Sequence, residues 1–148
     1  MERLFIGRHG RVNVDGSLLP EGIDDAHKMA ERLRDFGISR RAILLSSTSP
    51  HAVATAEIIK LDLTIPTMVR SPFIYKAGNY PQAIQNVWNF TSTLLEACDV
   101  EHTGAHVMMV THLSLVKTVA GSQLQHGGVY EVTEDWQNPE YIPDLKNA

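Results

Sequence analysis

Leu4-Phe5-Ile6-Gly7-Arg8-His9-Gly10 is the stretch of sequence that decides the fold. Its first four residues form a short apolar run, which is typical of a buried strand at the point where it leaves its sheet. At the carboxyl edge of a strand in an open α/β sheet, side chains face a crevice in which ligands bind. A permanent cation, an imidazole and a glycine at that edge could bind phosphate, supply a nucleophile and allow close approach. The three residues alone also allow a structural interpretation, in which Arg8 pairs with a carboxylate and His9 ties down a loop.

The composition is that of an ordinary soluble protein. Of the 148 residues, 43% are hydrophobic and 20% are charged, so a disordered chain is not expected. A chain of this length can bury one sizeable core, and we expect a single domain over residues 1–148. The net charge of −4 and the pI near 5.9 leave no broad basic surface for nucleic acid, although a local phosphate pocket needs only a few cations.

Cysteine content and hydropathy bear on the compartment and on partners. Cys98 is the only cysteine, so no internal disulfide and no multi-cysteine metal site can form, which fits a reducing compartment. The first apolar run is too short for a signal peptide, and no segment approaches the length of a membrane span. We therefore expect a cytoplasmic protein whose partners include neither a membrane nor a nucleic acid. The sequence leaves the oligomeric state open.

Strand patterns alternate with helix patterns along the chain. Apolar residues at helical spacing predict a helix over 21–36 that docks one face on a sheet: Ile23, Ala26, Ala30 and Leu33. Gly37 is placed to end this helix. We also predict strands at 4–7, 42–45, 67–70, 107–110 and 128–133, further helices at 50–60, 81–96 and 113–120, and a polar, irregular tail. This alternation implies an α/β fold, a three-layer sandwich in which helices flank a largely parallel central sheet.

Three histidines fall at one predicted edge of this sheet. His9 follows the first strand and His112 follows the fourth, and parallel strands share a carboxyl edge. His51 lies near the start of the helix after the second strand, on the same side. Arg8 adds a planar, two-pronged donor that matches phosphate oxygens. Seven histidines must fall somewhere in the chain, but three at one edge favour a site over coincidence.

At these residues the sequence resembles the histidine phosphatase superfamily, the group that includes the phosphoglycerate mutases. The stretch 4–10 looks like the family's first strand with its Arg-His-Gly signature. Residues 46–59 look like its second segment, and 107–112 like the strand that carries its second histidine. Leu18-Leu19-Pro20-Glu21-Gly22, followed by a helix, also fits. The match covers most of the chain in the family's order, and it implies a phosphoglycerate mutase-like fold.

The resemblance also implies a mechanism. His9 would be the nucleophile that takes the phosphoryl group, and water would then hydrolyse the phosphohistidine. Arg8 and His112 would hold the phosphoryl oxygens as charge shifts in the transition state. The substrate would be a phosphorylated small molecule or a phosphoprotein. No cofactor and no metal would be required.

Two residues near the signature depart from the family's pattern. His51 stands where the second segment normally carries a phosphate-binding arginine, and an imidazole lacks the guanidinium fork and can lose its charge. If His51 binds phosphate in its place, activity should fall as pH rises through its titration. Arg11 stands where an acidic residue or a glutamine often follows the signature. It either adds positive charge to the pocket mouth or is simply solvated.

A third departure bears on the substrate. Many members of the family carry a glutamate general acid in the loop after the third strand, but the sequence has no carboxylate between Asp62 and Glu96. Alkyl phosphate esters have poor leaving groups and gain most from a general acid, whereas phosphohistidine and acyl phosphates need less help. The run His112-Leu113-Ser114-Leu115-Val116 and the small size look like the short phosphohistidine phosphatases. The alternative is a phospho-ligand-binding or regulatory module of the same fold with impaired catalysis.

Other chemistry-bearing residues favour structural roles. His102 and His106 are four residues apart, but the intervening Thr103 and Gly104 argue against a helical metal pair. The serines at 46, 47 and 49 lack a nucleophile-elbow pattern, so we expect them at a helix start, with Ser49 as the cap.

Overall fold

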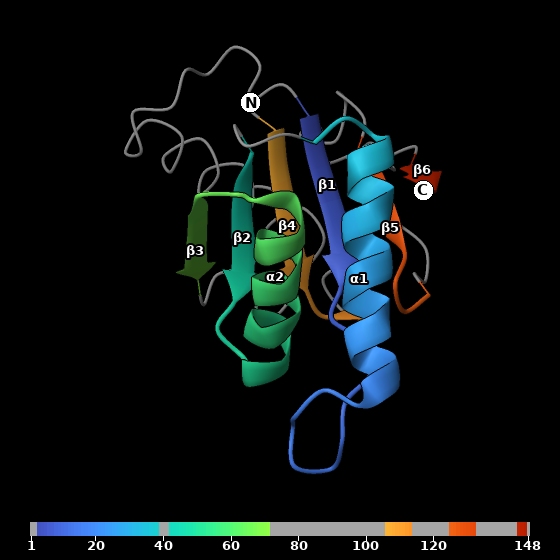
Figure 1. Ribbon diagram of the computed structural model, residues 1–148, viewed down its shortest axis with the longest axis vertical. Helices are drawn as coiled ribbons and strands as arrows, with labels where there is room; N and C mark the ends of the chain where they lie inside the picture. Colours follow the sequence, from blue (N-terminus) through green and yellow to red (C-terminus); the bar gives the residue numbers. More distant parts are fainter. Residues whose placement is uncertain (1–2, 39–41, 72–105, 114–124, 133–144, 148) are drawn as a thin grey trace, which may run out of the picture.

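A computed structural model describes residues 3–38, 42–71, 106–113, 125–132 and 145–147. The elements in chain order are β1 (Arg3–Arg8), α1 (Pro20–Asp35), β2 (Ile43–Ser47), α2 (Pro50–Leu63), β3 (Thr67–Ser71), β4 (His106–Thr111), β5 (Val129–Val132) and β6 (Leu145–Asn147). The six strands form one sheet in the order β3-β2-β4-β1-β5-β6 (Figure 1). The helices predicted at 81–96 and, beyond its first residue, at 113–120 lie outside the described residues.

The sheet is largely parallel, as predicted. β4 pairs in parallel with β1 and with β2, and β2 pairs in parallel with β3. β5 is antiparallel to β1, and β6 is antiparallel to β5. Both α1 and α2 lie on the same face of the sheet (Figure 1). The α/β fold class expected from the sequence is confirmed.

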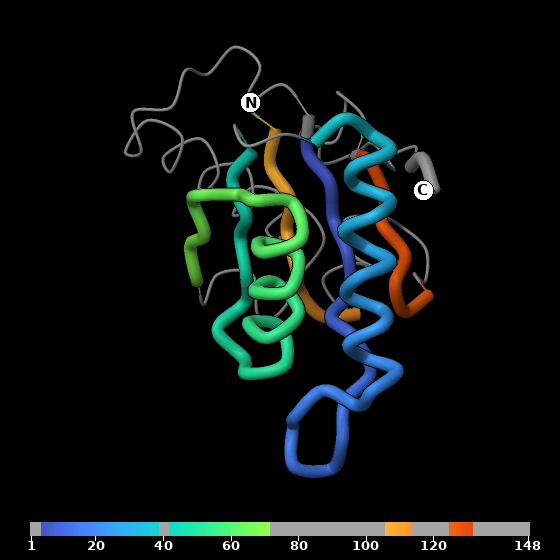
Figure 2. Tube along the Cα trace, viewed as in Figure 1, coloured from blue at the N-terminus to red at the C-terminus, as the bar shows by residue number. Residues whose placement is uncertain are grey.

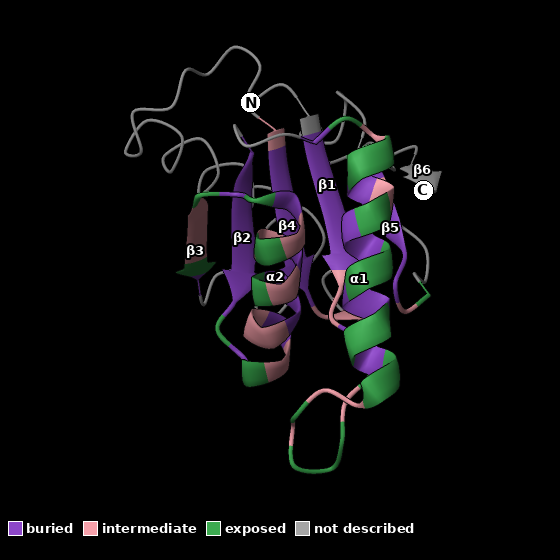
Figure 3. Cartoon of the chain, in the orientation of Figure 1, coloured by how far each residue is buried: buried purple, intermediate pink, exposed green. Residues whose placement is uncertain are grey.

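Both faces of the central strands are buried (Figure 3). On one face Phe5, Leu44 and Met108 lie in register on adjacent strands and pack with the apolar residues of α1 and α2. Side chains alternate along a strand, so the intervening residues point to the opposite face: Leu4, Ile6, Ile43, Leu45, Val107 and Met109, none more than 2% exposed. A sheet buried on both faces is what a three-layer sandwich requires.

α1 begins at Pro20 and presents a narrower apolar face than the sequence predicts. Ala26, Ala30 and Leu33 are buried, but Ile23 is 42% exposed, so its predicted burial is wrong. The inward side of the first turns is instead occupied by Gly22 and Asp25. The helix ends at Phe36, and Gly37 follows with a φ of 86°, a left-handed conformation that ends the helix as predicted.

The tail differs from the prediction. Residues 145–147 form β6, whereas an irregular tail was expected. Tyr130, Glu131 and Val132 of β5 pair with this short segment, which has no apolar alternation of its own, so the order comes from long-range pairing that a local pattern does not carry. In the part of the chain that the structure describes, neither helix has the length and apolar character to cross a membrane.

Candidate functional site

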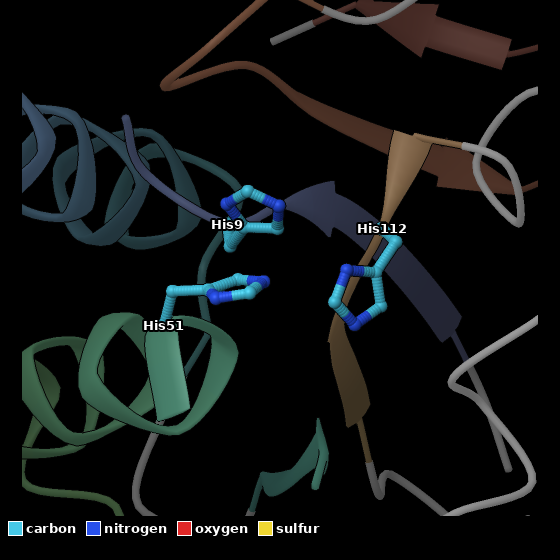
Figure 4. Close-up of side chains that lie close together, drawn as sticks. All are labelled: His9, His51 and His112. Atoms are coloured by element: carbon cyan, nitrogen blue, oxygen red, sulfur yellow. The ribbon is translucent and has the colours of Figure 1, made fainter. Parts of the chain in front are cut away.

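Three imidazoles meet at the carboxyl end of the parallel strands (Figure 4). The ring centroids of His9 and His51 are 4.2 Å apart, and each lies 5.2 Å from that of His112. The sheet order explains the meeting. β1 and β4 are neighbours, and the backbone N–H of His9 donates to the carbonyl of Thr111 at 3.0 Å, which extends their ladder past the strand ends. His51 comes from the first turn of α2, after the adjacent β2.

His9 is held in one tautomer. Its Nδ1 lies 2.8 Å from the carbonyl oxygen of Gly10; since a carbonyl only accepts, Nδ1 carries the hydrogen in the neutral ring and Nε2 carries the lone pair. The pKa of His9 is lowered to about 4: burial is the largest cause, the bond to the Gly10 carbonyl opposes it, and the neighbouring His51, His112 and Arg8 add to the lowering. The ring is therefore neutral at neutral pH.

His112 is oriented by two serine hydroxyls. Its Nε2 lies 2.8 Å from Ser47 Oγ and 3.2 Å from Ser49 Oγ, which leaves Nδ1 on the side of the ring that faces the other two histidines (Figure 4). Burial, and then the nearby His51, lower the pKa of His112. Ser49 occupies the N-cap position of α2, but its side chain makes no capping bond. The capping interpretation of this serine is therefore wrong, because its hydroxyl serves His112.

The two arginines near the signature differ in how their charge is used. Arg8 makes no described ion pair, and its Nε is buried without a hydrogen-bond partner in the described part of the chain. Burial lowers its pKa, and Asp25 opposes that shift. Arg11 instead grips the buried Asp25 with two guanidinium bonds of 3.0 Å, and its backbone N–H donates to the same carboxylate at 3.1 Å. The charge of Arg11 is therefore paired with Asp25, a partner that the sequence does not predict, while the Arg11 side chain stays 44% exposed to solvent.

A buried threonine joins two of the histidine-bearing segments. The N–H of Gly10 donates to Thr55 Oγ1 at 3.0 Å, and the Thr55 hydroxyl donates to the carbonyl of His51 at 2.8 Å. Thr55 is fully buried. Gly10 also packs so closely on Gly22 of α1 that a Cβ would collide with the carbonyl there. These contacts set the loop after β1 against both helices.

The His51 ring has no hydrogen-bond partner among the described residues, and burial lowers its pKa.

A fourth imidazole, which the sequence does not single out, lies beside His9. Nδ1 of His126, from the turn before β5, is 3.4 Å from the His9 carbonyl. Burial lowers the pKa of His126, and Arg8 adds to the shift. Nothing local in the sequence connects residues 117 positions apart.

The arrangement can bind either of two kinds of ligand. Arg8 and the donor nitrogens of the imidazoles suit an oxyanion. The histidines at 9, 51 and 112 can also hold a metal ion, since each offers a nitrogen and these nitrogens all lie within 4.8 Å of one another. Of the pair weighed as a metal site from the sequence, His102 lies outside the described residues.

Comparison with known proteins rests on structure, because no family model and no curated protein matches the sequence. One similar structure is the protein histidine phosphatase SixA complexed with tungstate: TM-score 0.73, 20% identity, covering 97% of this chain and 94% of that one. Another is mycobacterial glucosyl-3-phosphoglycerate phosphatase: TM-score 0.70, 14% identity, covering 100% of this chain and 97% of that one. The resemblance predicted from the sequence is thus confirmed at the level of the fold: the chain shares the phosphoglycerate mutase-like fold of these solved phosphatases.

Proposed function

We propose that this protein is a phosphatase that acts through a phosphohistidine at His9. The observation that carries the proposal is the state of His9: its Nδ1–H is tied to the Gly10 carbonyl, and its Nε2 lone pair faces the space shared with His51 and His112. A neutral imidazole with a fixed tautomer is ready to attack phosphorus without a separate base.

The reaction runs in two steps. In the first, Nε2 of His9 forms a bond to phosphorus while the bond to the leaving group breaks, and the leaving group departs with the electron pair. In the second, water attacks the phosphohistidine, which releases inorganic phosphate and restores the neutral ring. Arg8 stabilises charge on the phosphoryl oxygens in both steps, because its guanidinium is not consumed by a described carboxylate.

His112 acts as a second donor to the phosphoryl group. Ser47 donates to Nε2 of the ring in one of its two possible hydrogen-bond arrangements, and Nδ1 then carries the hydrogen. That N–H lies on the face shared with His9 (Figure 4). His51 donates a further hydrogen bond, at full strength only while it is protonated.

The substrates that fit best carry good leaving groups. Among the described residues, Asp25 is the carboxylate whose charge acts on Arg8 and His126, and Arg11 engages both of its oxygens. A phosphohistidine protein or an acyl phosphate needs less proton donation than an alkyl ester. We therefore favour a phosphohistidine phosphatase, and the fold shared with a protein histidine phosphatase supports this.

A substrate panel on wild type and two variants tests the proposal. Phosphohistidine peptide, acetyl phosphate and an alkyl phosphate are compared, and acid-labile phosphate on the protein is measured after rapid quenching. We expect turnover of the first two by wild type and none by His9→Ala. Unchanged turnover by His9→Ala would remove His9 as the nucleophile. His51→Arg should raise kcat/KM at pH 8 roughly tenfold or more, because a charged donor is worth about 1.5–3 kcal/mol.

The second candidate is a module that binds phosphorylated ligands without turnover. Its support is the low charge of the pocket at neutral pH: burial lowers the pKa of His51, and Asp25 neutralises Arg11. The same panel separates the two functions. Saturable binding of the phosphohistidine peptide with no phosphate release favours the module.

A further inference from the structure

Three different segments of the chain bring their imidazoles to one point, those of His9, His51 and His112. This cluster suits a ligand other than the phosphoryl group. We propose that the three imidazoles together bind one divalent transition-metal ion of the zinc type, and that the bound ion blocks phosphoryl transfer. The proposed ion site rests on the geometry of the cluster alone. The proposed inhibition of phosphoryl transfer rests in addition on the proposed function.

The spacing of the nitrogens is close to that of a tetrahedral site. The three candidate ligand atoms lie within 4.8 Å of one another. Zinc–imidazole bonds of about 2.0–2.1 Å place ligand nitrogens about 3.4 Å apart in a tetrahedron. Each nitrogen therefore needs to move inward by less than about 1 Å, which small side-chain rotations supply.

Each ring offers one nitrogen to the cluster. Nδ1 of His9 donates to the Gly10 carbonyl, so Nε2 presents its lone pair. When Nε2–H of His112 donates to Ser47, Nδ1 presents a lone pair toward the cluster. Both are the outer contacts that usually orient metal-bound histidines. The ring of His51 has no hydrogen bond among the described residues, so both of its nitrogens are available.

The donor set selects the kind of ion. Three imidazole nitrogens suit Zn²⁺, Ni²⁺ or Cu²⁺, whereas Mg²⁺ and Ca²⁺ prefer oxygen ligands. The neighbouring Arg8 guanidinium weakens the site for any cation, so only ions with a strong preference for imidazole should bind. A set of three histidines also leaves a fourth position for water or an anion.

The block follows from the identity of the ligand atom. The lone pair on His9 Nε2 that would bind the ion is the same lone pair that would attack phosphorus. Ion and phosphoryl group therefore exclude each other. Binding of the ion depends on His51, because an arginine at this position, as in the family pattern, is a permanent cation and cannot ligate a metal.

Titration of the full chain with ZnCl₂, followed calorimetrically after treatment with a chelator, tests the ion site. We expect one ion at the cluster in wild type, and binding at least tenfold weaker in His51→Arg and in His51→Gln. The matched control is His27→Gln, which removes an exposed histidine of α1 whose ring pairs with Asp62 at the far end of α2 from His51. This variant should bind as wild type does, and MgCl₂ should give no binding.

Two results would overturn the ion site: no zinc binding by wild type, or equal affinity in both His51 variants. Far-UV circular dichroism of each variant shows that a loss of binding is not a loss of fold. Turnover of the best phosphodonor then tests the block. Zinc should inhibit wild type reversibly by chelation and spare His51→Arg. If zinc binds and no donor is turned over, the proposed function fails and the ion site stands; if zinc-loaded enzyme turns over freely, the block fails.

Discussion

His9 and His51 are the same kind of side chain in the same pocket, yet the proposed chemistry asks for opposite charge states. His9 must be neutral to attack, and His51 binds phosphate best when protonated. Burial lowers the pKa of both rings, that of His9 to about 4. Because the pKa of His51 is lowered, a neutral His9 and a protonated His51 can occur together only below the ordinary imidazole value of about 6.5.

We therefore predict that kcat/KM has an acidic optimum. It should rise as pH increases through about 4, where His9 loses its proton. It should then fall as pH rises further, because His51, whose pKa is lowered, loses its proton before the pH reaches the ordinary imidazole value of about 6.5. The measurement is a pH–rate profile with a phosphodonor that does not titrate in this range and with a chelator present. His51→Arg should lose the alkaline limb. A wild-type profile that stays flat from pH 5 to 8 would count against a charged role for His51.

Gly10 has a steric role as well as its hydrogen bond. A Cβ at this position would run into the backbone of Gly22, which cannot move aside as a flexible side chain could. We predict that Gly10→Ala lowers the free energy of unfolding by about 2–3 kcal/mol, as overpacking of a tight contact does. Urea denaturation measures it.

Gly16→Ala is the matched control for that variant. Gly16 has φ of 88° but nothing within 4 Å of an added Cβ, so the change there should cost only about 1 kcal/mol of backbone strain. Equal costs at the two positions would show that the close approach of Gly10 and Gly22 does not matter.

At the scale of elements, Thr55 connects the loop after β1 to the first turn of α2. Thr55→Val keeps the shape but leaves the buried Gly10 N–H without its acceptor, which costs about 1–3 kcal/mol. We predict that loss in urea denaturation, together with a lower kcat/KM because His9 and His51 are no longer held together. Thr55→Ser keeps the hydroxyl and should retain most of both. A valine variant as stable and active as wild type would contradict the bridging role.

The strands that carry the site could be predicted from local patterns. Short apolar runs ending in His9 and His112 mark parallel strands, and parallel strands bring their carboxyl ends to one edge whatever lies between them. This geometric rule is why the sequence places three histidines together. The roles of these residues in catalysis stay predictions.

Other parts of the site depend on contacts that no local pattern carries. A serine at a helix start can cap the helix or bond a distant ring, and for Ser49 the distant His112 wins. Arg11 finds Asp25 only after α1 docks, and the strand at 145–147 exists only against β5. In each case tertiary packing overrides a propensity that is weak by itself.

At the scale of the whole molecule, the buried imidazoles link stability to pH. The histidines at 9, 51, 112 and 126 all have pKa values lowered by burial. Between those values and about 6.5 the unfolded chain binds more protons than the folded one, so stability is full above pH 6.5 and is lost as pH falls. We predict a lower Tm at pH 5 than at pH 7 in the presence of a chelator. A His9→Asn variant should show a smaller difference, and a higher Tm at pH 5 would contradict the linkage.

The strand order also dictates when the pocket can exist during synthesis. β1 is made early, but its neighbours in the sheet, β4 and β5, begin at His106 and Val129, and the tube in Figure 2 shows this early strand lying between two late ones. A nascent chain ending after β3 therefore holds an apolar strand with no partner along either edge, which is the kind of segment that chaperones cover. His9 and His112 therefore come together only after β4 has been made, so a chain that is released earlier cannot form the histidine cluster.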